Sequence, residues 1–199
     1  MQARAAELYE KYENLYDLLV SIIQVSEQRV ISEEPDDLFS DNVNFFVKSY
    51  MINICSYLEA YIQDLAFEYA KVVNERVRNA KIPHNFIYWK VAKEVKDKDL
   101  EFKEANYPAD KKEISESVSA NPYKTIKLYR LLGVDLTSEA SFNANKELVN
   151  SVVIKRNNIV HHNDSAMDVS FSDLIINIEA FKKYMEAIKC AVVHATNST

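Results

Sequence analysis

The sequence has a single glycine and only four prolines among its 199 residues. These two residue types supply many of the tight turns that connect β-strands, so their scarcity leaves little room for a sheet. One glycine also cannot form the glycine-rich loop that cradles phosphates in many nucleotide-binding proteins. Apolar residues recur at helical spacing through most of the chain. The sequence therefore predicts an all-α protein without a glycine-rich nucleotide site.

Cysteine and long apolar runs are scarce as well. The two cysteines, Cys55 and Cys190, cannot form a disulfide framework, and both fall within apolar helical patterns. We expect two small buried thiols in a reducing, cytoplasmic environment. No apolar run approaches the roughly 20 residues that a membrane span requires, and the charged N-terminus does not resemble a signal peptide. We therefore expect a cytoplasmic protein with no membrane contact.

Metal ligands do not form a recognisable pattern. No spacing of cysteines and histidines suits zinc. His161, His162 and Asp164 are close together in the sequence. However, adjacent histidines on a helix point about 100° apart, so they cannot easily share one metal. We expect no metal and no other cofactor.

Positive charge is the last feature in short supply. The chain has 24 Lys and Arg residues against 30 Asp and Glu residues, which gives a formal net charge of −6. Broad, non-specific binding of nucleic acid normally needs a basic face, so this balance counts against it. The composition still allows a compact site with a few locally placed cations.

The chain does contain a series of amphipathic segments. Its length suits one domain, residues 1–199, with a substantial core. Residues from about 79 to 120 are rich in charge and weakly periodic, so we expect a variable, exposed insertion there. The predicted helices cover residues 2–31, 40–78, 84–95, 121–132 and 141–162, and a final helix follows Ser170. The expected cap of the second helix is Ser40 or Asp41, and that of the fifth is Ser138 or Ser141.

The fifth predicted helix carries a charge in an unexpected place. Five residues at spacings of three and four form one apolar stripe, and one of them is an arginine: Val149, Val152, Val153, Arg156 and Val160. An uncompensated charge on such a stripe costs several kcal/mol. We therefore expect a carboxylate, a cluster of carbonyl groups or a phosphate beside Arg156.

Polar residues follow this arginine toward the end of the helix. Asn157 and His161 are four residues apart, so their side chains are neighbours on an adjoining face. Asn163 and Asp164 are expected to stop the helix, which places His161 and His162 in its last turn. A cluster of Arg, Asn and His at a helix end is a plausible site for phosphate chemistry.

The run Arg156-Asn157-Asn158-Ile159-Val160-His161 resembles the signature of HEPN domains, in which an arginine and a following polar residue precede a histidine by a few positions. The segment Ser49–Leu65, which contains Glu59, is similar to the long helix that faces the motif helix in HEPN nucleases. The resemblance does not cover residues 79–120. It implies an all-α, HEPN-like helical bundle of about five to seven helices with long antiparallel core helices. It also implies, as in many members, a metal-independent ribonuclease of prokaryotic defence or toxin–antitoxin systems.

Metal-free cleavage suits these residue types, because RNA carries its own nucleophile, the 2′-OH. A histidine can take up or release a proton near neutral pH, and an arginine can stabilise the crowded phosphate. The resemblance accordingly implies catalytic roles for Arg156, Asn157 and His161, with His162 and Glu59 as auxiliary residues. Three lysines are candidates for contact with the RNA backbone: Lys155, Lys124 and Lys127.

The chemistry of acid–base RNA cleavage also indicates which partners the chain needs. Acid–base cleavage needs two proton-transfer groups, and one chain offers one well-placed histidine. We therefore expect a homodimer formed through the motif helix, with Val149, Val153 and Val160 packed against their counterparts in the second copy. RNA is the expected substrate, and an antitoxin or another defence-system protein is a further candidate partner.

Alternatives are open from the sequence alone. Arg156 can be an interhelical ion-pair partner without a catalytic role, and Glu59 can be a surface residue of a long helix. The chain is then a non-catalytic HEPN-like module that binds a nucleotide or a partner protein within a defence system. The basic residues between 124 and 130 can equally complement a helix dipole. His84 and His194 are expected to be structural.

Overall fold

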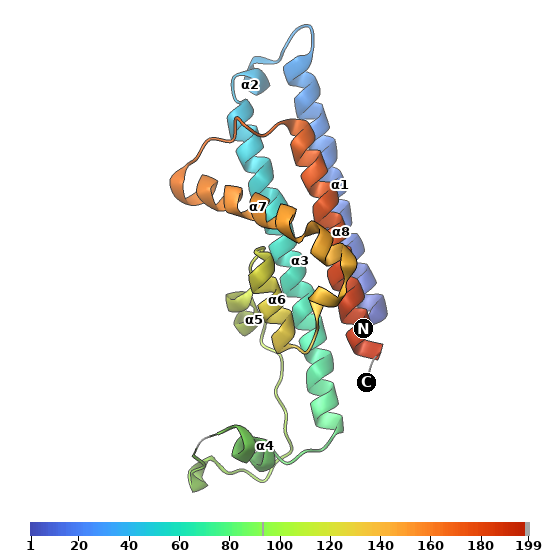
Figure 1. Cartoon of the computed structure of the whole chain (residues 1–199), viewed down its shortest axis with the longest axis vertical. Helices are drawn as coiled ribbons and strands as arrows, with labels where there is room; N and C mark the ends of the chain where they lie inside the picture. Colours follow the sequence, from blue (N-terminus) through green and yellow to red (C-terminus); the bar gives the residue numbers. More distant parts are fainter. Residues whose placement is uncertain (93, 198–199) are drawn as a thin grey trace.

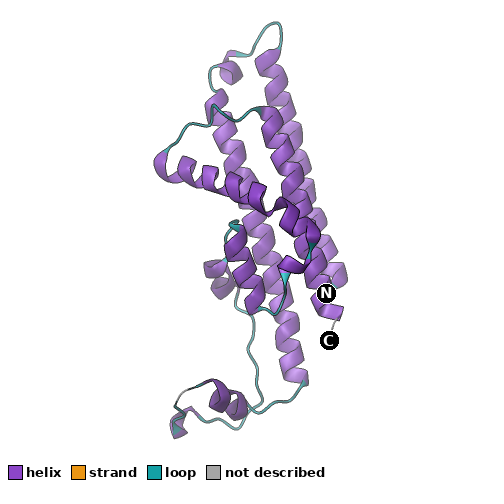
Figure 2. Ribbon diagram, in the orientation of Figure 1, coloured by secondary structure: helices purple, strands orange, loops and turns teal. Residues whose placement is uncertain are grey.

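The structure, a computed structural model, describes residues 1–92 and 94–197, and the regular structure among them is helical (Figure 1; Figure 2). An isolated bridge between Pro83 and Glu104 belongs to no strand. The all-α prediction is confirmed. Lys93, which the helix predicted for 84–95 included, lies outside the described residues. The helices are α1 (Gln2–Ile31), α2 (Asp37–Ser40), α3 (Val43–Asn79), α4 (His84–Val91), η1 (Asp97–Asp99), α5 (Lys111–Ser117), α6 (Pro122–Leu131), η2 (Leu136–Ser138), α7 (Ala140–His162) and α8 (Phe171–Asn197).

Three long helices form the core. α1 runs antiparallel to α3 and α8, and each of the three contacts the other two (Figure 1). Buried tyrosines join them. The hydroxyl of Tyr16 on α1 donates to the carbonyl oxygen of Ile54 on α3 at 2.7 Å, and that of Tyr61 on α3 donates to the carbonyl oxygen of Met185 on α8 at 3.0 Å. A buried hydroxyl without an acceptor would cost roughly 1–3 kcal/mol, so these bonds favour this one pairing of the helices.

α7 crosses this core, and its first part is packed on α3 and α8. The ring of Phe142 stacks on that of Tyr184 in α8, with 4.6 Å between the ring centroids. Val149, Val152 and Val153 are buried in the same contact. The predicted apolar stripe is therefore correct over this part of the helix.

The C-terminal end of α7 extends away from α8 (Figure 1). Val160 is 50% exposed there, and Ile159 takes the last buried place on the helix. Val160 is therefore an exposed member of the predicted stripe. An apolar stripe can continue three or four positions after Arg156, and in this chain the buried position is the third one, Ile159.

Several helix ends follow local capping. The Asn121 side chain accepts hydrogen bonds from two backbone N–H groups of the first turn of α6, and Gly133 follows that helix with a φ of +80°. Ser170 and Asp173 cap α8 reciprocally. The Asp173 N–H donates to Ser170 Oγ at 3.0 Å, and the Ser170 N–H donates to the Asp173 carboxylate at 2.9 Å. These ends agree with the predicted ones.

Two helix starts differ from the expected caps. α3 begins at Val43 instead of Ser40 or Asp41, because the preceding residues form the short helix α2, capped by the Asp36 carboxylate. α7 begins at Ala140, which lies between the two predicted caps, Ser138 and Ser141. The side chain of the preceding residue, Glu139, does not cap the helix. The short helices α2 and α5 were not predicted.

Residues 80–92 and 94–104, which we call the arm, leave the end of α3 and carry α4 and η1 away from the other helices (Figure 1). The chain then returns to α3, where α5 packs.

The environments of the two cysteines differ. Cys55 is buried on α3 as expected, whereas Cys190 on α8 is partly exposed, so the expectation of two buried thiols was wrong for Cys190. Among the helices described, none combines the length and the apolar character needed to cross a bilayer.

Candidate functional site

Arg156 lies on the buried face of α7 and points toward α3. Its Nη2 is 2.6 Å from Oε1 of Glu59, and the two side chains are 17% and 33% exposed. The carboxylate is the compensating group that a charge on an apolar stripe requires. A charge-assisted contact this short is strong in a partly buried setting. Glu59 is therefore paired rather than free at the surface of its helix.

The same carboxylate connects a third helix to the pair. Oε1 of Glu59 also accepts a hydrogen bond from the backbone N–H of Ala120 at 3.2 Å. Ala120 precedes the cap of α6, Asn121, whose Nδ2 donates to Oδ1 of Asn150 on α7 at 3.0 Å. α3, α6 and α7 thus meet around one glutamate, which limits how far Arg156 can move.

Cys55 is one helical turn before Glu59 and also adjoins Arg156. Burial raises the pKa of the Cys55 thiol to about 11, and the nearby arginine offsets only part of that rise. Burial by itself lowers the pKa of Arg156, but Cys55 and Glu59 outweigh that effect and raise it. Since the thiol is protonated at neutral pH, Glu59 supplies the negative charge that holds the guanidinium. The buried Nε of Arg156 has no hydrogen-bond partner among the described residues.

The two histidines lie in the last turn of α7, and both are exposed. Their ring centroids are 6.4 Å apart with an interplanar angle of 61°. Five helical positions correspond to a rotation of about 140°, so His161 does not share the direction of Arg156. Within one chain, the side chain of Arg156 therefore points toward α3 and that of His161 points toward solvent.

Asn163 ends α7 in the left-handed conformation, with a φ of +54°. Its carbonyl oxygen and its Oδ1 accept hydrogen bonds from Nζ of Lys48 on α3, at 3.1 and 2.9 Å. The helix stop was predicted, but the role of Lys48 was not. No local sequence signal indicates a contact between residues 115 positions apart.

The lysines proposed for RNA contact do not join Arg156. Nζ of Lys155 lies 2.6 and 2.9 Å from the two carboxylate oxygens of Asp168. Lys124 and Lys127 are exposed on α6 and line a shallow pocket together with Glu116. Lys155 is therefore paired with an acid, whereas Lys124 and Lys127 share their pocket with one.

Of the three valines expected at a dimer contact, one is exposed and two are buried. Val149 and Val153 are buried in the core of their own chain, so the expectation that they pack against a second copy was wrong. Helical spacing could not distinguish a stripe that faces the core from one that faces a partner. Of the three valines proposed, Val160 is the exposed one.

The remaining histidines lie apart from this cluster. The ring of His84 is stacked parallel to that of Tyr88, with 6.0 Å between centroids. Nδ1 of His194 lies 2.9 Å from the carboxylate of Glu139. Among the residues described, no group of three or more His, Cys, Asp or Glu side chains is arranged to hold a metal ion.

Comparison with known proteins gave one match. The family model described as RiboL-PSP-HEPN matches residues 9–194. No curated protein and no solved structure matches the chain. The matched range includes the Arg156–Glu59 pair and both histidines of the last turn of α7.

Proposed function

The chain belongs to the RiboL-PSP-HEPN family, and on that premise we propose that it is a metal-independent endoribonuclease that acts as a toxin or an abortive-infection effector. The observation that carries the proposal is Arg156, which is paired with Glu59 of α3 and lies on the same helix as an exposed His161. The pair holds a planar cation near the surface, and the histidine adds a group that can transfer protons.

In this proposal Arg156 binds the scissile phosphate. Glu59 presents a carboxylate oxygen to the guanidinium at 2.6 Å, which is the kind of contact that a phosphate oxygen also makes. The buried Nε has no partner among the described residues, and a phosphate would reach it only after the Arg156 side chain turned outward. Glu59 thus keeps Arg156 charged and oriented before RNA arrives, and Asn157 adds a neutral donor beside it.

Cleavage requires two proton transfers. A base removes the proton of the 2′-OH, the freed oxygen attacks phosphorus, and the bond to the 5′-oxygen breaks as an acid protonates it. The products are a 2′,3′-cyclic phosphate and a 5′-OH end. His161 is the proposed proton-transfer residue, and His162 is the auxiliary one.

A homodimer would supply the second group. One chain directs His161 about 140° away from Arg156, so a second copy at the end of α7 would bring a further histidine and arginine to the same phosphate. Val160 is exposed at that end and would lie in the contact. The exposed Lys124 and Lys127, and Lys155 after release from Asp168, are proposed to contact the RNA backbone. Specific activity should fall on dilution as the dimer dissociates.

The direct test is incubation of the purified protein with RNA in the presence of EDTA. The proposal predicts that the chelator leaves the rate unchanged and that a 2′-deoxy substitution at the cut site blocks cleavage. Cleavage of DNA, or a rate that depends on Mg²⁺, would contradict the mechanism.

A non-catalytic module that binds a nucleotide or a partner protein is the second candidate. It is favoured by the neutralisation of Arg156 by Glu59 and by the net charge of −6. It predicts that RNA stays intact in the same assay, at every protein concentration and with or without EDTA.

A further inference from the structure

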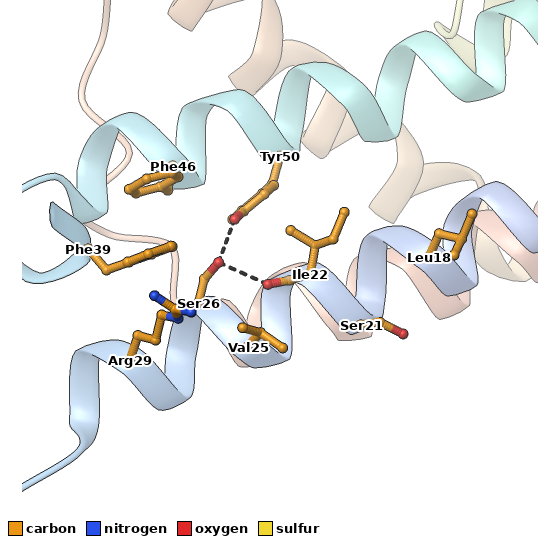
Figure 3. Close-up of a pocket in the computed structure, with 9 residues that line it drawn as sticks. All are labelled: Leu18, Ser21, Ile22, Val25, Ser26, Arg29, Phe39, Phe46 and Tyr50. Carbon is orange, nitrogen blue, oxygen red and sulfur yellow. Dashed lines mark hydrogen bonds between the residues drawn. The ribbon is translucent and has the colours of Figure 1, made fainter. Parts of the chain in front are cut away.

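An apolar groove of about 500 Å³ lies between α1 and the start of α3, with α2 at one end (Figure 3). One wall comes from α1 and the other from α2 and α3: Leu18, Ile22 and Val25 face Phe39, Phe46 and Tyr50. Ile22 is 53% exposed, and its neighbours on α1 are similarly open. A contiguous apolar surface of this kind is typical of an interaction site.

The wall opposite α1 is aromatic. The rings of Phe39 and Phe46 are stacked with 4.7 Å between centroids, and the ring of Phe46 lies 6.3 Å from that of Tyr50. The hydroxyls of Tyr50 and Ser26 share a hydrogen bond of 2.6 Å, so the polar atoms at this wall are already satisfied (Figure 3). The groove therefore favours an aromatic or aliphatic occupant over a polar one.

The arm carries a surface of the same character. Phe86 and Trp89 are one turn apart on α4, their ring centroids are 6.3 Å apart, and both are more than half exposed. Nζ of Lys90 lies 4.0 Å from the centroid of the Trp89 ring. α4 thus presents two adjacent aromatic rings with a positive charge beside them.

The two surfaces match in length. α4 has eight residues and is about 12 Å long, whereas the stretch of α1 from Leu18 to Arg29 spans about 18 Å. A helix of the length of α4 therefore fits along the groove.

The two surfaces also match in charge. Residues 27–41, at the α2 end of the groove, contain six acidic residues against one arginine, whereas Lys90 is the only lysine or arginine of α4. Opposite charge beside a shared apolar contact favours one orientation of the docked helix.

The arm and the groove are at opposite ends of the same molecule (Figure 1). Within one chain they cannot meet in this arrangement. We propose that α4 of one copy docks into the groove of a second copy, with Phe86 and Trp89 against the aromatic wall. This contact joins two different surfaces and uses no residue of α7, so it is independent of pairing at the motif helix and of cleavage.

The chain provides its own reporter, because Trp89 is its only tryptophan. Its side chain is 60% exposed in a single copy, so the emission should be that of a solvated indole in dilute solution. Docking would remove the ring from water. The emission of the unmodified protein should therefore move to shorter wavelength as the concentration rises.

Ile22→Glu places a charge in the groove at an exposed position and should abolish the shift without unfolding α1. Leu131→Glu is the matched control, because Leu131 is an equally apolar, exposed residue on α6, far from the groove residues in sequence. The control protein should keep the full shift with concentration.

Mixing two variants tests the contact between copies. The Ile22→Glu protein keeps the reporter and an intact arm but has no usable groove. The Trp89→Ala protein is silent but keeps an intact groove. Adding the silent protein should move the emission of the Ile22→Glu protein to shorter wavelength. An emission that is independent of concentration, a shift that survives Ile22→Glu, or a mixture without rescue would each overturn the proposal. None of these results bears on RNA cleavage.

Discussion

The first part of α7, Ala140–Arg156, is packed on α3 and α8, whereas its end, Val160–His162, is exposed to solvent. One helix therefore carries a structural segment and a segment free to meet a ligand. Arg156 lies at the junction, paired with Glu59 on the inner side. Substitutions before the junction should act mainly on folding, and substitutions after it should act mainly on activity.

The largest effect is expected within the packed part. Val153→Asp buries a charge at a position that is 1% exposed, at a cost of several kcal/mol against a total stability of about 5–15 kcal/mol. We expect most of the helical signal to be lost, as measured by circular dichroism and urea unfolding. Val160→Asp is the control in the exposed part and should keep a urea midpoint close to that of the unmodified protein. Equal midpoints for the two variants would show that the packing of α7 is wrong.

His161→Ala should have the next largest effect, and that effect should be on cleavage alone. General acid–base catalysis by one side chain contributes about 10²–10⁴-fold in rate, while the exposed ring makes little contribution to stability. Single-turnover RNA cleavage and thermal unfolding measure the two quantities. His162→Ala is the neighbouring control and should lose less activity. The reverse order would identify His162 as the main proton-transfer residue.

Glu59→Gln tests the junction itself. It keeps the shape and an acceptor oxygen but removes the charge that faces Arg156, so we expect a loss of about 1 kcal/mol in the free energy of unfolding. Glu7→Gln is the control, because the Arg4–Glu7 pair is exposed on both sides and its loss should have little effect. Cleavage by the Glu59→Gln protein should also slow, since Arg156 is less well oriented. Identical urea curves for the two variants would argue against a stabilising role of the inner pair.

The smallest effect is expected from Asn157→Ala. The loss of one neutral hydrogen bond to phosphate or histidine corresponds to about 1 kcal/mol, or roughly a fivefold decrease in the cleavage rate. Asn158→Ala removes the same side chain one position further along the helix and should leave the rate unchanged. A larger loss for Asn158→Ala would mean that the wrong asparagine was assigned to the site.

Part of the site around Arg156 could be predicted from the sequence. An arginine on an apolar stripe required a compensating group, and the HEPN resemblance indicated Glu59 as a candidate. The 2.6 Å contact agrees with both. The helix caps at Asn121 and Ser170 could also be predicted from the sequence, because each depends only on neighbouring residues.

Other features depend on the relative placement of distant helices. The exposure of Val160 follows from where α3 and α8 lie, and the Lys48–Asn163 contact joins residues far apart in the chain. Helical periodicity contains no such information. Catalytic roles for Arg156, Asn157 and His161, and pairing of two copies at α7, stay predictions.

The most direct test of the central claim is the rate of RNA cleavage in EDTA by the unmodified protein and by Arg156→Ala and Arg156→Lys proteins of equal helicity. The account predicts that the unmodified protein cuts RNA to leave a 2′,3′-cyclic phosphate. Arg156→Ala should lose at least about 100-fold in rate, the usual effect of removing one donor that stabilises a transition-state oxyanion. Arg156→Lys should also be impaired, because lysine keeps the charge but lacks the planar fork. Undiminished cleavage by the Arg156→Ala protein would contradict the account.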